Sequence, residues 1–401
     1  MNIIHINSCN FGSTGNIALQ IAAETRKKGH TVYTACPKSR DNKKKTVENQ
    51  IFIGNRISRN IHLALAKITG LNGCFSIFST LLFLRKIKKL KIDLIHLHNL
   101  HNCYINIPLL FRFIKKNNLK TVWTLHDCWA FTGQCPHFTL IKCDKWKSKC
   151  DSCPQYKNYP SAYVDLTKLM YKKKKRWFTG VKDMTVVTPS QWLKDLVKKS
   201  FLKEYPVKVI NNGIDLNVFK PTDSDFRKKY KIDSSKKILL GVAFDWGIRK
   251  GLDVFTELAK RLDSDKYQIV LVGTDTQIDG KLPDNIISVH RTQDQTELAE
   301  IYTASDLFVN PTREDNFPTV NMESLACGTP VITFNTGGSP EVIDEHCGDV
   351  VQSNGIEELI HKIINIFEVG VSTNEKRISK AQSFDKNIKF NEYVNLYEVT
   401  L

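Results

Sequence analysis

The sequence lacks an apolar run long enough to cross a membrane. Its longest apolar stretch, residues 75–84 (FSIFSTLLFL), is about half of the ~20 residues that a spanning helix needs. This composition predicts a buried helix, with an interfacial anchor as the less favoured alternative. The first residues, MNIIHINSCNFGSTG, also lack the basic segment and cleavage signature of a secretory signal, so we expect a cytoplasmic protein.

Acidic residues are scarce in the first half of the chain. Residues 1–200 hold 35 Lys and Arg against 10 Asp and Glu, a net charge of +25, whereas residues 201–401 hold 23 against 31, a net charge of −8. The opposite signs predict different binding tasks for the two halves. The basic runs suit an anionic membrane surface or a nucleic acid. Because no nucleic-acid-reading module is recognisable, we expect the membrane surface as a partner and no nucleic acid.

The order of apolar runs predicts the fold class. At 401 residues the chain is long enough for two domains. Strand-like runs alternate with helical patterns, which predicts two doubly wound parallel sheets of the α/β class. The predicted strands are 2–7, 31–35, 94–98, 121–125, 185–188, 237–243, 268–272, 286–289, 307–310 and 331–334.

The turn-forming Asn211-Asn212-Gly213 marks the junction between the two predicted sheets. We therefore predict an N-terminal domain of residues 1–208 and a C-terminal domain of residues 209–380. Residues 381–401 are expected to form a last helix that returns to the N-terminal domain.

A turn of small residues, Gly12-Ser13-Thr14-Gly15, follows the first predicted strand and precedes a helix predicted over residues 16–28. Small residues let the backbone approach a ligand, and the N–H groups of the helix would point at an anion. The turn does not match G-x-G-x-x-G, and no acidic residue ends the second predicted strand, so an NAD site is not expected. A simple tight turn is the alternative interpretation.

Two segments of the second half carry charged residues directly after predicted strands. Arg249-Lys250-Gly251 opens a helix, and cations at that place suit a diphosphate held without a metal ion. Asp315 and Glu323 lie eight positions apart, the first in a loop and the second near the start of a helix predicted from about Thr319. Carboxylates accept hydrogen bonds from vicinal hydroxyls, so this pair suits a sugar and a ribose.

In order and spacing, these motifs resemble glycosyltransferase family 4, a family of retaining enzymes of the GT-B type that act on surface polysaccharides. The resemblance covers nearly the whole chain and implies two Rossmann-like domains that face a central cleft. The motifs that carry it are 211–215 with Phe219 and Pro221, 249–252, 271–273, Tyr302 with 304–306, 315–323, 326–331 and 336–338.

The resemblance also implies a role for single residues. Glu323 would bind the nucleotide ribose, Asp315 the hydroxyls of the donor sugar, and Lys250 the diphosphate; His126 would lie near the reacting sugar carbon, which makes His126, Asp315 and Glu323 the expected catalytic residues. The base would be met by residues 290–292, and the donor phosphates by 12–15. The expected donor-binding residues are Gly12, Ser13, Gly15, Arg249, Lys250, Gly273, His290, Arg291, Glu314, Asn316, Phe317, Pro318 and Thr319.

Two positions depart from the family pattern. The first motif carboxylate is Asp315 where the family has Glu, and the adjacent Glu314 is an alternative for that contact. Phe244 occupies a position where the family often has an Arg. Since no clearly placed nucleophile is seen, the resemblance favours same-face attack without a catalytic metal, in which the protein contributes positioning and charge stabilisation.

A long insertion, residues 126–160, holds four cysteines, Cys135, Cys143, Cys150 and Cys153. The C-x2-C spacing of the last two predicts a structural zinc site, and buried reduced thiols are the alternative, with His137 as another possible ligand. Catalytic zinc is not expected, because four cysteines leave no open position. His96, His98 and His101 are interpreted as polar groups at a strand end, since no carboxylate accompanies them.

The motifs and the charge together predict a function. We expect transfer of a sugar from a nucleotide-sugar donor, with retention, to a polyprenyl diphosphate-linked or other membrane-proximal saccharide. Polysaccharide, capsule or O-antigen assembly at the inner face of the cytoplasmic membrane is the expected setting. A nucleotide-sugar epimerase or hydrolase of the same architecture is the alternative.

Overall fold

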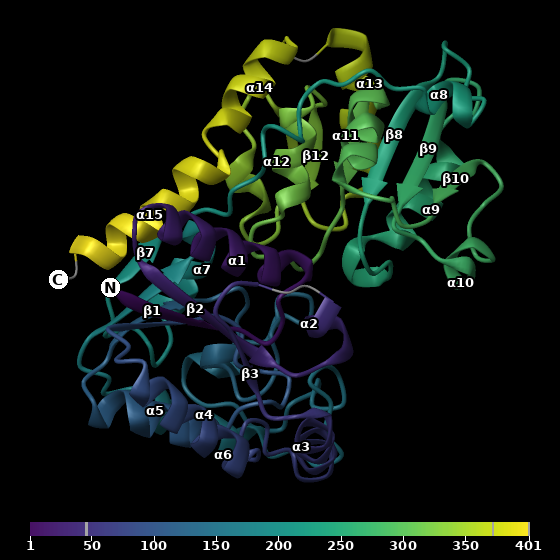
Figure 1. Ribbon diagram of the computed structural model, residues 1–401. Helices are drawn as coiled ribbons and strands as arrows, with labels where there is room; N and C mark the ends of the chain where they lie inside the picture. Colours follow the sequence, from purple (N-terminus) through teal and green to yellow (C-terminus); the bar gives the residue numbers. More distant parts are fainter. Residues whose placement is uncertain (45–46, 371–372, 400–401) are drawn as a thin grey trace. The chain divides into compact units, whose positions relative to one another are not determined.

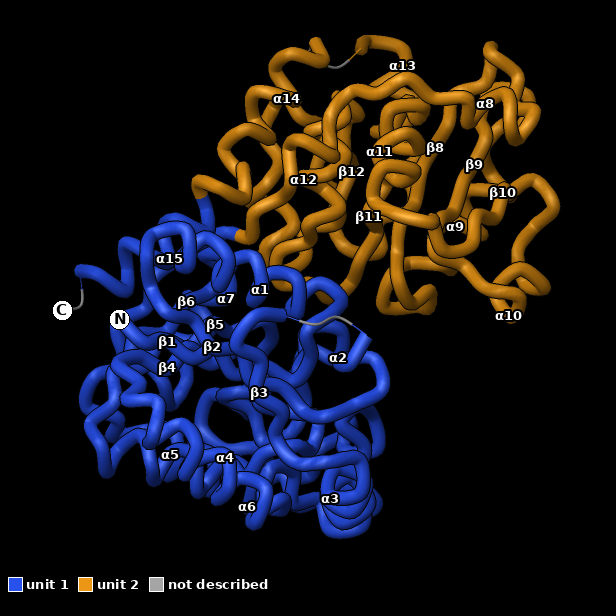
Figure 2. The backbone as a smooth tube through the Cα atoms, in the orientation of Figure 1, with its two compact units in different colours: residues 1–211, 389–401 blue, residues 212–388 orange. Residues whose placement is uncertain are grey.

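The computed structural model describes residues 1–44, 47–370 and 373–399 and divides the chain into two compact units (Figure 1). Unit 1 comprises residues 1–211 and 389–401, and unit 2 comprises residues 212–388 (Figure 2). The boundary thus follows Asn211, whereas the predicted boundary followed residue 208. Of the C-terminal residues predicted to return to the first domain, those from 389 onward belong to unit 1.

Unit 1 is built on a parallel sheet with the strand order β3-β2-β1-β4-β5-β6-β7. Its strands are β1 Asn2–Ile6, β2 Thr31–Pro37, β3 Gln50–Ile53, β4 Leu94–Leu97, β5 Lys120–Thr124, β6 Met184–Thr188 and β7 Val207–Val209. Its helices are α1 Gly12–Lys27, α2 Arg40–Lys44, α3 Arg56–Thr69, α4 Ile77–Lys89, α5 Ile107–Lys116, α6 Thr167–Phe178 and α7 Gln191–Lys198, with most of α15 Lys386–Val399.

The last helix completes the core of unit 1. Phe390, Tyr393, Leu396 and Tyr397 of α15 are buried and form one cluster with strand residues such as Ile3 of β1. Residues of α1 join the same cluster, whereas α4 and α5 pack in a separate one against the sheet. The sheet is therefore covered on both faces, as a parallel sheet requires.

Unit 2 is built on a second parallel sheet, with the order β10-β9-β8-β11-β12-β13. Its strands are β8 Lys237–Val242, β9 Tyr267–Val272, β10 Ile286–Val289, β11 Leu307–Asn310, β12 Val331–Phe334 and β13 Gly348–Val351. Its helices are α8 Phe226–Lys229, α9 Leu252–Arg261, α10 Thr276–Asp279, α11 Gln295–Ala304, α12 Thr319–Ala326, α13 Ile356–Val369 and α14 Asn374–Gln382. The predicted α/β class with two doubly wound parallel sheets is confirmed.

Two local predictions were wrong. The first helix begins at Gly12, with φ 67°, so the small residues form its first turn instead of a loop before it. Helix α4 is only partly buried. Phe83 and Ile87 lie in the core, but Phe78 is 83% exposed and Leu82 is 64% exposed. No helix within the described ranges combines the length and apolarity that a membrane span requires.

Candidate active site

In each unit, some of the loops that carry predicted site residues leave the sheet where the strand order reverses. In unit 2 this point lies between β8 and β11, which pair side by side although two strands separate them in sequence. Loops after such strands diverge and leave room for a ligand at their carboxyl ends. Residues 243–251 follow β8 and residues 311–318 follow β11, and the Arg313 N–H donates to the Arg249 carbonyl at 2.8 Å. The structure therefore brings two of the predicted motifs together.

Lys250 and Asp315 form an ion pair at this point. The Lys250 Nζ lies 2.6 Å from the Asp315 Oδ2, and both side chains are about one fifth exposed, 19% and 21%. Gly251 has φ 79°, and a Cβ there would lie 2.6 Å from Pro311. The glycine thus permits the close approach of the two loops that pairs the motif cation with the first motif carboxylate.

Glu323 lies on α12 as a buried carboxyl group. The Tyr302 hydroxyl donates to its Oε2 at 3.4 Å. Burial raises the pKa of Glu323 to about 7, although hydrogen bonds from Thr319 and Tyr302 act to lower the pKa. A carboxyl group in this state can accept or donate hydrogen bonds near neutral pH, which suits a pair of ribose hydroxyls.

The residues between the two carboxylates are held mainly through the backbone. The Asn316 carbonyl accepts from Gly338 N at 3.1 Å, and the Phe317 carbonyl accepts from Asn212 Nδ2 at 3.2 Å. The Phe317 side chain is buried in the core of unit 2, and Glu314 is also buried. Pro318 is the N-cap residue of α12, and Thr319 is its first residue.

Arg313, in the same loop, was not among the predicted site residues, and its side chain ties the loop to other parts of unit 2. Its guanidinium donates to Asp253 at 2.8 and 2.7 Å and to the Ile248 carbonyl at 2.6 Å. These partners lie about sixty residues earlier in the chain. Local spacing carries no signal for such a contact.

The predicted base-side residues lie beyond β8, β9 and β10. Gly273 has φ 86°, and a Cβ there would lie 1.9 Å from the Ala243 carbonyl oxygen, so the position requires glycine. The His290 Nε2 lies 2.6 Å from Asp279. The Arg291 guanidinium lies 5.2 Å from the centre of the Phe244 ring. Phe244 occupies the position where the family often has an Arg, so a cation from another loop lies next to this position.

In unit 1 the strand order reverses between β1 and β4. Gly12, Ser13 and Gly15 form the first turn of α1 after β1, and a Cβ at Gly15 would lie 2.8 Å from the Asn10 backbone. The Asn7 side chain, which sequence reasoning missed, accepts from Asn99 N at 3.2 Å and thereby ties the end of β1 to the end of β4. Gly12 and Ser13, at the start of this helix, are exposed.

His126 ends a chain of buried imidazoles in unit 1. Its Nε2 lies 3.1 Å from His98 Nδ1, and His98 Nε2 lies 3.1 Å from His5 Nδ1. Burial lowers the pKa of His126 to about 4, against the effect of the neighbouring Asp127. Near neutral pH the ring is therefore uncharged and is held in place by its hydrogen bonds.

Asp127 is a second residue that sequence reasoning missed. Its carboxylate lies 2.9 Å from His101 Nε2 and accepts from Trp129 N at 2.8 Å. Burial acts to raise its pKa, but His101 and the backbone hydrogen bond outweigh burial and hold the pKa at about 2. A fixed negative charge therefore lies next to His126 in the chain.

His5, His96 and His98 place their ligand nitrogens within 4.8 Å of one another, and they are the one group of this kind within residues 1–44, 47–370 and 373–399. Both His96 nitrogens have partners, since Nδ1 lies 2.6 Å from the Tyr397 hydroxyl and Nε2 lies 2.8 Å from the Thr124 hydroxyl. No carboxylate belongs to the group. The contacts describe a hydrogen-bonded network in the core.

The four cysteines of the insertion line one small cavity, together with Phe138 and Trp146. Across the described ranges, however, no three of their sulfurs lie within the 4.8 Å at which metal ligands gather. The Gly133 N–H donates to Cys150 Sγ at 3.2 Å, and burial raises the pKa of Cys135 to about 12. The donor set fits zinc while the sulfur spacing does not, and the zinc site stays a prediction.

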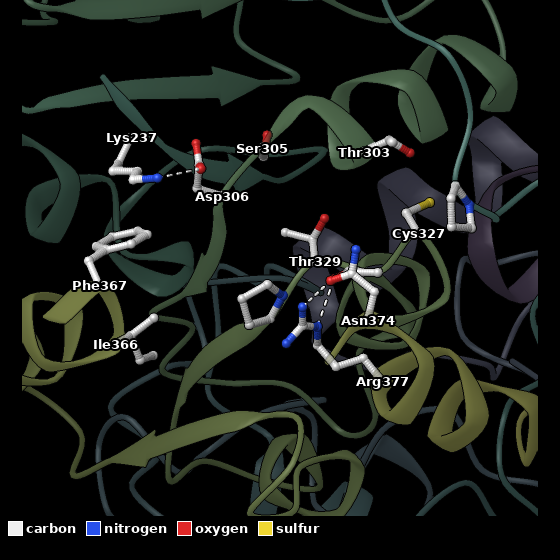
Figure 3. Close-up of a pocket in the computed structure, with 13 residues that line it drawn as sticks. Lys237, Thr303, Ser305, Asp306, Cys327, Thr329, Ile366, Phe367, Asn374 and Arg377 are labelled. Atoms are coloured by element: carbon white, nitrogen blue, oxygen red, sulfur yellow. Dashed lines mark hydrogen bonds and ion pairs between the residues drawn. The ribbon is translucent and has the colours of Figure 1, made fainter. Parts of the chain in front are cut away.

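A separate pocket of about 320 Å³ lies at the opposite ends of the unit 2 strands (Figure 3). Lys237 at the start of β8 and Asp306 just before β11 line it and pair at 3.4 Å. Arg377 donates to the Gly328 carbonyl at 2.7 Å. The pocket contains none of the predicted site residues and lies away from the carboxyl ends of the strands, where ligands of such sheets bind.

Comparisons with known proteins identify the family. The model of Glycosyltransferase Family 4 matches residues 14–218, and that of Glycosyl transferases group 1 matches residues 222–384. The colanic acid biosynthesis glycosyl transferase WcaC of Escherichia coli (strain K12) is 27% identical over 309 residues, which cover 74% of this chain and 73% of that protein.

Two solved structures have the same fold over the whole chain. Sucrose-phosphate synthase from Thermosynechococcus elongatus has a TM-score of 0.73 at 21% identity and covers 99% of this chain and 98% of its own. Anabaena HepE in complex with UDP-glucose has a TM-score of 0.69 at 15% identity over 100% of both chains. The predicted GT-B fold is thereby confirmed.

Proposed function

Because the chain belongs to glycosyltransferase family 4, we propose that it transfers a sugar from a nucleotide-sugar donor to a lipid-linked or membrane-proximal saccharide, with retention of configuration. The observation that carries this proposal is the Lys250–Asp315 ion pair at the strand reversal of unit 2. The buried carboxyl group of Glu323 lies on α12, the helix that follows the same loop. A cation for the diphosphate and two carboxyl groups for hydroxyls are the groups that such a donor needs.

The proposed chemistry assigns each group a task. Lys250, aided by Arg249, neutralises the charge that develops on the leaving diphosphate, so no catalytic metal is needed. Asp315 binds hydroxyls of the donor sugar and Glu323 binds the ribose. The neutral His126 of unit 1 hydrogen-bonds the transferred sugar, and the leaving phosphate takes the proton of the acceptor hydroxyl on the same face.

The setting is proposed from the relatives and from charge. The name of WcaC supports a role in the assembly of a bacterial surface polysaccharide or lipopolysaccharide. The excess of basic residues in the first half of the chain supports peripheral binding to the anionic inner face of the cytoplasmic membrane.

The test is nucleoside diphosphate release from UDP-, GDP- and dTDP-sugars, with and without a polyprenyl diphosphate-linked acceptor. We expect acceptor-dependent release from one donor, its loss in Glu323→Ala, and its retention in the matched control Glu368→Ala, at an exposed position of α13. Proton NMR of the product should show the anomeric configuration of the donor. Release without acceptor, or an inverted product, would contradict the proposal.

A further inference from the structure

Two neighbouring helices of unit 1 expose large apolar side chains to solvent. Helix α3 buries only His62 and Ala66, and α4 exposes the apolar side chains of its first two turns. We call these exposed side chains the apolar surface: Ile57, Ile61, Leu63, Leu65, Ile68, Ile77, Phe78, Leu81 and Leu82. Contiguous apolar patches on a protein surface mark a binding site for a protein or a membrane.

Hydrogen bonds join the two helices into one surface. The Ser58 and Ser79 hydroxyls lie 2.8 Å apart, and His62 Nδ1 lies 2.8 Å from the Ser76 hydroxyl. At the end of α3, the Tyr163 N–H donates to the Lys67 carbonyl at 2.7 Å, and the Tyr163 side chain is exposed. These contacts place the two helices next to each other in unit 1.

The charged residues of the segment that contains both helices all have the same sign. Residues 49–92 contain no Asp or Glu and eight Lys or Arg. Four of these cations, Arg85, Lys86, Lys88 and Lys89, are exposed on the last turns of α4, directly after its exposed apolar turns. An apolar face with basic residues beside it is the pattern of helices that lie in the interface of an anionic bilayer.

This charge disfavours a second copy of the chain as the partner. A symmetric dimer would bring the same patch of both copies together. The eight cations of residues 49–92 would then face each other with no carboxylate of that segment to pair with. An anionic lipid surface instead supplies both an apolar interior and phosphates.

We propose that α3 and α4 form a membrane-docking surface, in which the apolar side chains enter the acyl boundary of an anionic bilayer and the α4 cations bind lipid phosphates. The inference deepens the proposed function, since it rests on a membrane-bound acceptor for its purpose. The binding itself is measured without any donor or acceptor.

The main test is co-sedimentation of the full chain with vesicles of phosphatidylethanolamine and phosphatidylglycerol. In the triple variant Ile61→Ser, Phe78→Ser, Leu82→Ser we expect vesicle affinity to fall about 1000-fold, since each inserted side chain contributes close to a factor of ten. The control Val369→Ser, Ile388→Ser, Val399→Ser removes three equally exposed apolar side chains elsewhere and should bind like the parent. Unchanged binding of the first variant would overturn the proposal.

Two further measurements separate lipid from other partners. Arg85→Gln with Lys89→Gln should weaken binding by roughly fivefold for each charge on anionic vesicles only. In Phe78→Trp the new indole should shift its emission to the blue and be quenched by brominated lipids. A dimer that dissociates in the triple variant, with no effect on vesicle binding, would assign the surface to a second copy and refute the proposal.

Failure here is distinguishable from failure of the proposed function. The triple variant should release nucleoside diphosphate at the parental rate with a short water-soluble acceptor, because its residues lie outside the candidate active site. Loss of that activity as well, with the fold intact by circular dichroism, would mean that the surface serves catalysis instead of docking and would count against the inference.

Discussion

At the residue scale, the ionisation of Glu323 makes the free energy of unfolding depend on pH. Burial raises the pKa of its carboxyl group to about 7, above the 4.5 of an unburied Glu. Below pH 4.5 the group is protonated in both folded and unfolded chains. As pH rises towards 7, Glu323 ionises in the unfolded chain while it is still neutral in the folded chain. The free energy of unfolding therefore decreases as pH rises through this range.

We therefore expect Glu323→Gln to be more stable than the parent at pH 8 by up to about 3 kcal/mol, and equal to it near pH 4.5. The same variant should lose affinity for the donor, because Gln cannot supply a carboxylate to the ribose. Urea unfolding at both pH values checks the first effect, with the exposed Glu368→Gln as control. An equal difference at both pH values would count against a neutral buried Glu323.

The Lys250–Asp315 pair leads to a second prediction. The Lys250 ammonium group lies 2.6 Å from the Asp315 carboxylate. Lys250→Ala should lower kcat/KM for the donor about 100-fold, since a charge aimed at the leaving diphosphate is lost. Lys260→Ala, at an exposed position of α9, should leave kcat/KM unchanged. Steady-state kinetics decide the matter, and a normal rate in Lys250→Ala would remove this residue from the mechanism.

Sequence reasoning reached the residues that act through motifs and missed those that act through distant partners. Lys250, Asp315 and Glu323 were found because each stands at a fixed distance after a strand. Arg313 and Asp127 were not, because their partners lie elsewhere in the chain: Asp253 for Arg313 and His101 for Asp127. Only the folded chain shows such pairs.

At the element scale, the loop after β12 supports the motif loop. Gly337 has φ 58°, and a Cβ there would lie 1.6 Å from the Asp315 carbonyl oxygen. Gly337→Ala should therefore displace the Asp315 loop, lower the unfolding free energy by about 2 kcal/mol or more, and weaken donor binding. Gly280→Ala, which meets only one atom at 4.0 Å, is the control. Thermal unfolding and donor titration should show both losses only in Gly337→Ala.

The cysteine insertion carries an untested prediction. Its four thiols line one cavity, but their sulfurs must approach one another before zinc can bind. We expect one zinc per chain by elemental analysis of protein purified without chelator, and its loss in Cys150→Ser. Cys347→Ser, buried in unit 2, should keep the metal. Metal-free protein of unchanged stability would establish reduced thiols in an apolar cavity.

Most strands were predicted, but two short ones were not. β10, β11 and β12 have the predicted bounds, whereas β3 and β13 were not predicted. Both missed strands are only partly buried, and each begins with polar or glycine residues, so each lacks an apolar run along its whole length. Helix α4 was misjudged for a related reason: an apolar run indicates hydrophobicity, but not whether protein or another apolar phase covers it.

At the scale of the whole molecule, the two units should respond to acid in opposite ways. Unit 1 buries five neutral imidazoles: burial lowers the pKa of His5 to about 3, of His62 and His126 to about 4, and of His96 and His98 well below 6.5. A lowered folded pKa gives stability that is present above pH 6.5 and is lost as pH falls below it. Glu323 gives unit 2 the reverse dependence between pH 7 and 4.5.

Between pH 7.5 and 5, we therefore expect unit 1 to lose stability, by about 2 kcal/mol at pH 5 from His62 alone, while unit 2 does not. Hydrogen exchange resolves the units, because amides of β1 and β4 report on unit 1 and amides of β8 and β11 on unit 2. His62→Gln should remove part of the acid loss in unit 1, and the exposed His361→Gln should not. Burial disfavours positively charged imidazoles in unit 1 and a negatively charged carboxylate in unit 2. Equal acceleration of hydrogen exchange in both units at acid pH would therefore contradict this prediction.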